Sequence, residues 1–187
     1  MAAVFLASYF LAVLVLRVGT TGFDWDDTLP LHLCDLVVFF AIDALASARR
    51  LSCELTYYWA MSGTLQALIT PDLHQGFPSL YYLLFFLGHG ANIVAVAVLL
   101  SSTGYRPSAR GVAEAFVGLL LYVMVVGALD DVFGWNYGYL CRAPSRASLV
   151  DLLGAWPDYI VSGLGLGIVL FVLLYLPWAR VGRAEAP

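Results

Sequence analysis

The sequence predicts an all-α integral membrane protein, a polytopic helical bundle of about six transmembrane helices forming one domain over residues 1–187. Composition is the first reason, because 61% of the residues are hydrophobic and only 12% are charged. Soluble domains are about half apolar and about a quarter charged, and a chain this apolar would aggregate in water. The second reason is a mean hydropathy of +0.85, concentrated in segments long enough to cross a hydrocarbon core of roughly 30 Å.

Six apolar segments are predicted to span the membrane. They cover residues 2–18, 29–48, 55–69, 77–100, 112–132 and 159–178. The loops between them are short, so neighbouring helices should pack antiparallel in one compact bundle. The first segment lacks the basic start of a signal peptide and is therefore expected to remain as a span.

The arginines predict how the bundle is oriented. Under strict alternation of the spans, three arginine pairs fall on one side of the membrane: Arg49 and Arg50, Arg106 and Arg110, and Arg180 and Arg183. The other side carries four aspartates together with two arginines: Asp24, Asp26, Asp27, Asp72, Arg142 and Arg146. The positive-inside rule then favours a multi-pass protein of the cell membrane with both termini in the cytoplasm.

Charge and cysteine content limit the partners. The net charge of −4 comes with no acidic or basic run, so nucleic acid is not expected as a partner. Three scattered cysteines suit neither a disulfide framework nor a Cys-x-x-Cys metal site. We expect no cofactor, and so small a bundle is compatible with a homo-oligomer.

Several polar side chains fall inside the predicted spans, where they are costly and therefore functional candidates. They are His32, Cys34, Asp35 and Asp43 in the second span, Gln66 in the third, His89 in the fourth, and Asp130 and Asp131 at the end of the fifth. Each has a structural alternative. The cysteine could pack as a small apolar group, the histidine could cap a helix, and the amide could join two helices.

Helical geometry separates the groups of "LPLHLCDL", residues 29–36. If the helix is regular from Pro30, Cys34 points about 200° away from His32, so a base for the thiol must come from another helix. His89 is the other histidine within a span. Its depth is an obstacle, since Cys34 lies about 6 Å below Pro30 and His89 about 18 Å below Phe77. A tilted second helix, or one that unwinds at Pro30, would remove this difference.

Five motifs in order resemble the YwaF family of bacterial membrane proteins, which is similar to animal transmembrane protein 164. They are "LPLHLCDL", "YYWAMSGTLQALITPDL", "GFPSLYYLLFFLGHG", "NYGYL" and "SLVDLLGAWPDYI". They lie between about Leu29 and Pro177, and family members usually carry one more helix before the first span, which makes seven.

The resemblance implies an acyltransferase acting on ether phospholipids, with a membrane-embedded cysteine that carries the acyl group and a histidine downstream. By position, Cys34 resembles that cysteine and His89 that histidine. The animal proteins place a histidine directly after the cysteine, where this chain has Asp35.

On this hypothesis His89 takes the thiol proton as Cys34 attacks an acyl carbonyl and forms a thioester. Gln66, or backbone amides near Pro30, would stabilise the oxyanion. His32 and Asp35 would contact the lipid headgroup, and Cys34 and His89 are then the catalytic pair.

Two other classes stay open from the sequence. In a metal-dependent lipid hydrolase of the seven-helix type, three histidines and an aspartate hold zinc. This chain has three histidines in all, and His74 falls in a predicted loop, so Asp35 or Asp43 would be needed as a ligand. A non-catalytic transporter or lipid-binding protein would instead use the buried histidines and aspartates to contact a solute or relay protons.

Overall fold

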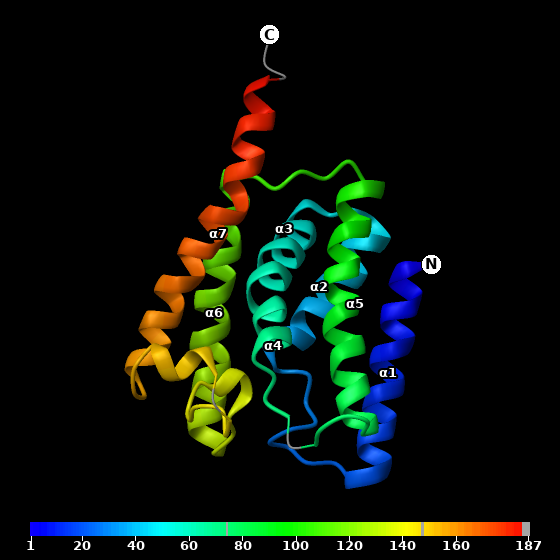
Figure 1. Ribbon diagram of the computed structural model, residues 1–187, viewed down its shortest axis with the longest axis vertical. Helices are drawn as coiled ribbons and strands as arrows, with labels where there is room; N and C mark the ends of the chain where they lie inside the picture. The colour runs from blue at the N-terminus through cyan, green and yellow to red at the C-terminus, as the bar shows by residue number, and fades with distance from the viewer. Residues whose placement is uncertain (74, 147, 185–187) are drawn as a thin grey trace.

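A computed structural model describes residues 1–73, 75–146 and 148–184, and over these residues the chain is helical without any strand. Its elements, in chain order, are α1 (Ala2–Thr21), α2 (Leu33–Ser47), α3 (Arg50–Trp59), the π-helical turn η1 (Ala60–Thr64), α4 (Leu65–Ile69), α5 (Leu80–Ser102), α6 (Ala109–Phe133), the short 3₁₀ turns η2 (Tyr137–Tyr139) and η3 (Leu149–Leu152), and α7 (Asp158–Ala184) (Figure 1). The predicted all-α membrane bundle is confirmed.

Four of the predicted spans form helices that are long and apolar enough to cross a membrane, namely α1, α5, α6 and α7. The other two predicted spans differ from these. Helix α2 has 15 residues and rises only about 22 Å at 1.5 Å per residue. The third is the continuous run of α3, η1 and α4, which begins with the polar stretch from Arg50 to Glu54.

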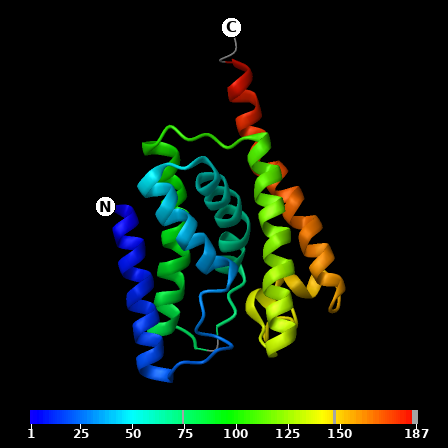
Figure 2. The same cartoon turned by 180° about the vertical axis from the view of Figure 1, so that it is seen from behind.

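The bundle is built around α3, which packs against α2, α5 and α6. Helix α1 packs on α2 and α5, and α7 packs on α6, at opposite sides of the bundle (Figure 2). The α2–α3 turn, the α5–α6 connection and the end of α7 lie at the upper end in Figure 1, and the other connections lie at the lower end. Each of these loops therefore lies at the end of the bundle that strict alternation of the spans predicts.

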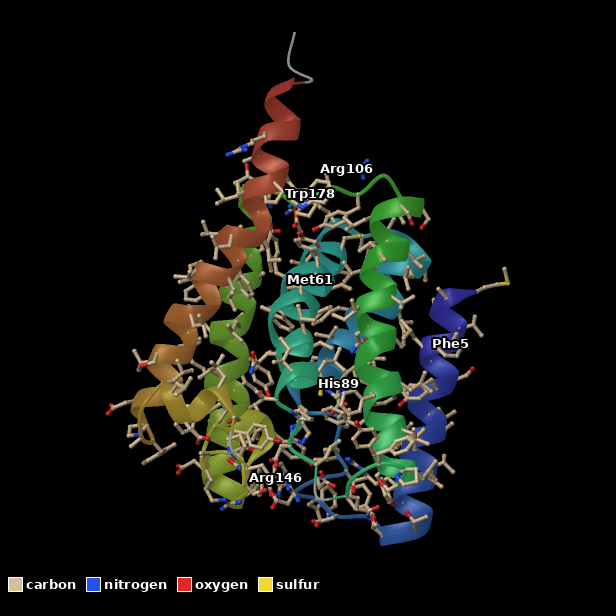
Figure 3. All side chains as sticks on the ribbon, viewed as in Figure 1. Phe5, Met61, His89, Arg106, Arg146 and Trp178 are labelled. Atoms are coloured by element: carbon tan, nitrogen blue, oxygen red, sulfur yellow. The ribbon has the colours of Figure 1, made fainter. Side chains whose placement is uncertain are left out.

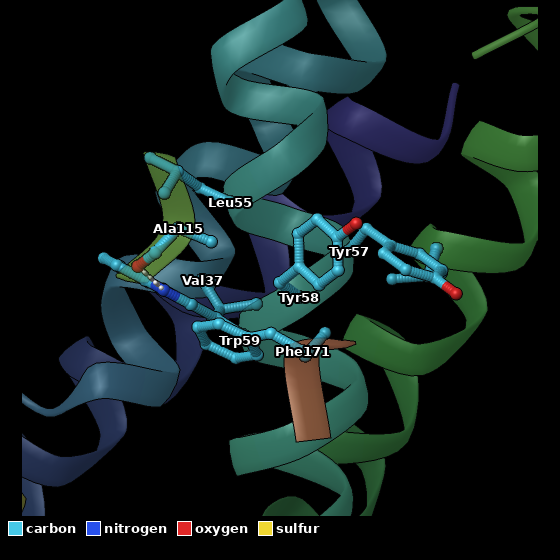
Figure 4. Close-up of a cluster of buried hydrophobic side chains, with 9 residues drawn as sticks. Val37, Leu55, Tyr57, Tyr58, Trp59, Ala115 and Phe171 are labelled. Atoms are coloured by element: carbon cyan, nitrogen blue, oxygen red, sulfur yellow. Dashed lines mark hydrogen bonds between the residues drawn. The ribbon is translucent and has the colours of Figure 1, made fainter. Parts of the chain in front are cut away.

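Aromatic side chains of α3 form the centre of the core (Figure 4). Tyr58 is fully buried and its ring lies 5.4 Å from that of Phe171 on α7. The Trp59 indole Nε1 donates to the Ala115 carbonyl of α6 at 3.0 Å, which satisfies its polar atom inside the core. These contacts bring α3, α6 and α7 together.

A buried glutamate explains why α3 starts earlier than the predicted span 55–69. Glu54 is 0% exposed, but its carboxylate accepts hydrogen bonds from the Tyr105 hydroxyl at 2.6 Å, the Ser108 hydroxyl at 2.5 Å and the Arg50 guanidinium at 3.3 Å. Burial of a carboxylate is tolerated only when it is paired and hydrogen-bonded in this way. The polar residues at the start of α3 therefore contact the α5–α6 connection inside the protein.

The predicted start of the second span at residue 29 is wrong by four residues, because α2 begins at Leu33. Residues 22–32 form a non-helical stretch, which we call the unwound segment. Pro30 lies in it and cannot donate a backbone hydrogen bond. The Tyr137 hydroxyl donates to the Trp25 carbonyl at 2.7 Å and accepts from the Leu29 amide at 3.0 Å, while the Tyr122 hydroxyl donates to the Leu31 carbonyl at 3.1 Å. Side chains of α6 and η2 therefore replace the missing helical bonds.

Candidate functional site

The candidate nucleophile lies in the first turn of α2, where the unwound segment ends. His32 is the N-cap residue in an extended conformation (φ −65°, ψ 146°), and Cys34 is the second residue of the helix. The residue as a whole is partly exposed. The first amides of a helix have no partner within it and carry partial positive charge, so they can donate to an anionic group bound beside this turn.

His32 contacts the η2 turn. Its Nδ1 accepts a hydrogen bond from the Gly138 amide at 3.3 Å, and its ring meets that of Tyr137 edge-on at 5.0 Å. On a helix that is regular from Pro30, His32 would point away from Cys34. In the structure it precedes the helix, so that angle does not apply, and its contact with a lipid headgroup stays a prediction.

Helix α5 meets this first turn through Asn92. The Asn92 side-chain amide donates a long hydrogen bond of 3.5 Å to the Cys34 carbonyl. His89 lies three residues earlier on α5 and shares the face of the helix that carries Asn92. The unwound segment lets α2 begin deep in the bundle, which is one of the two ways in which the depth difference between Cys34 and His89 could be removed.

The His89 ring is held by its own helix. Its Nδ1 lies 2.9 Å from the Phe85 carbonyl, and the ring stacks on that of Phe85 at 4.0 Å. Figure 3 shows His89 in the lower half of α5. Since a carbonyl can only accept, Nδ1 carries the proton, and Nε2 is left with the lone pair that a general base needs.

The remaining predicted site residues lie at different places. Gln66 donates from Nε2 to the Thr70 hydroxyl at 2.6 Å, so one of its donor hydrogens bonds the end of its own helix. Asp35 lies in the first turn of α2, where a carboxylate interacts favourably with the helix dipole.

Asp43 belongs to the opposite end of α2. Its carboxylate accepts from the Ser52 hydroxyl and, at 3.1 Å, from the Ser47 hydroxyl, and it lies 3.8 Å from the Arg49 guanidinium. These contacts join α2 to the start of α3. Asp43 is therefore separate from the first-turn group that contains Cys34.

At the lower end of the bundle, η2 and the loop that follows it are hydrogen-bonded to the α4–α5 connection. The Tyr139 hydroxyl donates to Asp72 at 3.1 Å, and the Ser145 hydroxyl donates to the other oxygen of the same carboxylate at 3.1 Å. Burial, and then the neighbouring Asp72 charge, raise the pKa of Tyr139, and burial raises the pKa of Tyr137 to about 12. Both phenols therefore stay neutral hydrogen-bond donors at neutral pH. Arg146 in the same region is labelled in Figure 3.

Among residues 1–73, 75–146 and 148–184, no three His, Cys, Asp or Glu side chains are grouped as ligands of one metal ion. His74, which the sequence placed in a loop, lies outside the described residues.

An apolar groove of about 310 Å³ runs between α1 and α5. Phe5, which Figure 3 labels on α1, and Leu6 form its α1 side, and Phe86, Gly90 and Val94 belong to its α5 side. Gly90 and Val94 are each two residues from Asn92, which turns them about 200° around the helix. The groove is thus on the other side of α5 from the contact with Cys34.

Sequence reasoning missed Asn92, which is 2% exposed and whose Oδ1 accepts no hydrogen bond from the described part of the chain. Its signal was available in "GHGAN", because an amide inside an apolar span is costly. Asp130, noted from the sequence, is 1% exposed and likewise has no partner for its carboxylate oxygens among the described residues.

The four long apolar helices and the polar groups between them define an all-α integral membrane protein. The sequence matches the TMEM164 family over residues 1–175, and the chain belongs to that family. An uncharacterized protein of Treponema pallidum (strain Nichols) is 27% identical over 180 residues, which cover 92% of this chain and 74% of that protein. No solved structure matches the chain. The family resemblance predicted from the five motifs is confirmed.

Proposed function

We propose that the protein is a lipid acyltransferase that carries a phospholipid acyl chain as a thioester on Cys34, with His89 as the base. The observation that carries the proposal is the packing of the first turn of α2 against the His89-bearing face of α5, through the contact of Asn92 with the Cys34 carbonyl. A nucleophile beside a base whose own orientation is fixed by a further hydrogen bond is the arrangement that covalent catalysis requires. Here the Phe85 carbonyl orients the base.

The reaction would run in two transfers. His89 Nε2 takes the thiol proton while Cys34 Sγ bonds to the acyl carbonyl carbon of a donor phospholipid and the carbonyl electron pair moves onto oxygen. The intermediate then collapses, the ester C–O bond breaks, and the leaving alkoxide takes the proton from His89. The hydroxyl of a lysolipid, or water, attacks the thioester in the same way and releases the thiol.

The other polar groups take supporting roles in this proposal. Amides of the first turn of α2, or Gln66, would face the oxyanion. His32 and Asp35 would contact the headgroup at the end of the unwound segment. The arginine-bearing upper end would face the cytoplasm, by the positive-inside rule, which puts Cys34 in the outer half of a cell membrane.

The test is acyl exchange in proteoliposomes that contain the purified protein, a phospholipid with an isotope-labelled acyl chain and an unlabelled lysophospholipid. Transfer of label to the lysolipid is expected with the wild type and with Cys53→Ala and Cys141→Ala, and it should be absent with Cys34→Ala. Undiminished transfer by Cys34→Ala would overturn the thioester mechanism, and lipid binding without any transfer by the wild type would favour a binding protein or transporter.

A further inference from the structure

The chain has two asparagines, and their environments differ. Asn136, in the loop before η2, uses both ends of its amide. Its Oδ1 accepts from the amides of Cys141 at 3.0 Å and Arg142 at 2.8 Å, and its Nδ2 donates to the Arg142 carbonyl at 3.0 Å. Both ends of its side-chain amide are therefore hydrogen-bonded.

Asn92 is more deeply buried and much less satisfied. It is 2% exposed, and its Oδ1 has no partner among the described residues. Its donor bond to the Cys34 carbonyl is 3.5 Å long, against a usual 2.9–3.0 Å for such bonds. A buried polar group that is only partly satisfied lowers stability and needs an explanation. A hydrogen bond between neighbouring membrane helices accounts for the donor of this amide, but Oδ1 stays without a partner among the described residues.

The place of the Asn92 side chain points to a use for its second donor hydrogen. Its donor nitrogen lies at the backbone of the candidate nucleophile, one turn along α5 from the candidate base. The side-chain nitrogen of an asparagine carries two hydrogens. One of them therefore remains for a ligand while the other faces the Cys34 carbonyl. A donor fixed beside the nucleophile, in a site with little water, is what stabilises the oxyanion of an acyl transfer.

We infer that Asn92 is a catalytic residue, the side-chain donor that binds the ester carbonyl oxygen of the acyl substrate and stabilises the oxyanion formed when Cys34 attacks. The inference rests on the proposed function and deepens it, because it assigns the site to esters and thioesters, whose carbonyl oxygen gains charge during the reaction. As Sγ bonds to the carbonyl carbon, the π electron pair moves to oxygen. Asn92 donates to that oxygen until the pair returns and the alcohol leaves.

The experiment compares two reactions of the same thiol in phosphatidylcholine proteoliposomes that contain the full chain. Acylation of Cys34 by p-nitrophenyl decanoate passes through an oxyanion, and alkylation by iodoacetamide is a displacement that forms none. Both rates are measured for the wild type, for Asn92→Leu and Asn92→Asp, and for Thr56→Val. Thr56 is the matched control, because its hydroxyl is also buried without a partner among the described residues, but it lies on α3 and not on α5.

Loss of one oxyanion donor lowers acylation by roughly 100-fold, so we expect a fall of this order in Asn92→Leu and at least as large a fall in Asn92→Asp, whose negative charge opposes the oxyanion. Alkylation should stay close to the wild-type rate in Asn92→Leu, which also shows that the fold around Cys34 is kept. In Asn92→Asp the added charge opposes the attacking thiolate too, so its alkylation should fall as well. Thr56→Val should match the wild type in both reactions.

Other outcomes separate the two proposals. Equal acylation in the wild type and in the folded Asn92 variants overturns the oxyanion role while leaving the thioester mechanism intact. A parallel fall of acylation and alkylation in Asn92→Leu also overturns it, since Asn92 would then only position Cys34. A wild-type Cys34 that reacts with iodoacetamide but with no ester would instead overturn the proposed function itself.

Discussion

The two nitrogens of the His89 ring have different tasks in this account. Nδ1 is bonded to the Phe85 carbonyl of the preceding turn, which leaves Nε2 as the proton acceptor. The ring is also stacked on Phe85, so its direction is fixed by local contacts within α5. A residue held in this way is ready to act on a group that a neighbouring helix brings to it.

We therefore predict that His89→Ala lowers the rate of Cys34 acylation by about 100-fold or more, because general-base catalysis contributes at least that factor. Phe85→Leu keeps the carbonyl that holds Nδ1 and should cost much less. Both rates can be followed with p-nitrophenyl decanoate and the purified protein. If His89→Ala were acylated as fast as Phe85→Leu, the base would have to be another group.

The unwound segment is the element on which the site depends. A regular second helix from residue 29 would end its first turn before Cys34, and the cysteine would lie inside the helix with no unpaired amides near it. Because α2 begins at Leu33, Cys34 lies in its first turn. The contacts that keep the segment unwound come from Tyr122 and Tyr137, which are far away in the sequence.

A substitution at Gly138 tests how the unwound segment is held in place. Gly138 has a positive φ of 62°, and a Cβ there would overlap the Tyr122 hydroxyl that bonds the unwound segment. We predict that Gly138→Ala displaces Tyr122 and removes that bond, at a cost of about 1 kcal/mol added to about 1 kcal/mol for the left-handed conformation.

Gly134→Ala is the control for the backbone cost, because Gly134 has a similar φ of 75° with nothing within 4 Å of the added carbon. Thermal unfolding in detergent should show Gly138→Ala below Gly134→Ala, and Cys34 should be alkylated faster in Gly138→Ala. Equal melting temperatures for the two variants would show that Tyr122 does not hold the segment.

The contact between α3 and α6 at the upper end gives a second element-scale prediction. A Cβ at Gly111 would overlap the fully buried Glu54 carboxylate, so Gly111→Ala should break bonds of that group and destabilise the fold by about 3 kcal/mol. Gly165→Ala on α7 meets nothing within 4 Å and should be neutral or slightly stabilising in the same unfolding measurement. A Gly111→Ala protein as stable as Gly165→Ala would contradict the packing described for Glu54.

The sequence predicts the helices well and the site only in part, for physical reasons. Apolar length identifies α1, α5, α6 and α7 directly, since the membrane requires it. Hydropathy gives no sign that Glu54 is buried, because its partners Tyr105 and Ser108 come from a distant connection. The start of α2 and the role of Asn92 likewise depend on long-range hydrogen bonds, which no local pattern contains.

At the scale of the whole molecule, the loops rich in arginine lie at the upper end and the loops that surround the unwound segment at the lower end (Figure 1). We predict that the upper end is cytoplasmic. In a protein without native cysteines, Ala109→Cys reports on the upper end and Ala143→Cys on the lower, since both alanines are exposed. A membrane-impermeant maleimide added to intact cells should label only Ala143→Cys, and labelling of only Ala109→Cys would reverse the orientation.

The central claim is that Cys34 carries an acyl group, and trapping that group tests it most directly. The protein is incubated with a labelled phospholipid in proteoliposomes, denatured in acid and digested, and the peptides are analysed by mass spectrometry. The account predicts an acyl adduct on the Cys34 peptide that neutral hydroxylamine removes, with none on Cys53 or Cys141 and none in Cys34→Ser or in a denatured control. Acyl transfer to a lysolipid by the wild type with no adduct on Cys34 at any time, or equal transfer by Cys34→Ser, would contradict it.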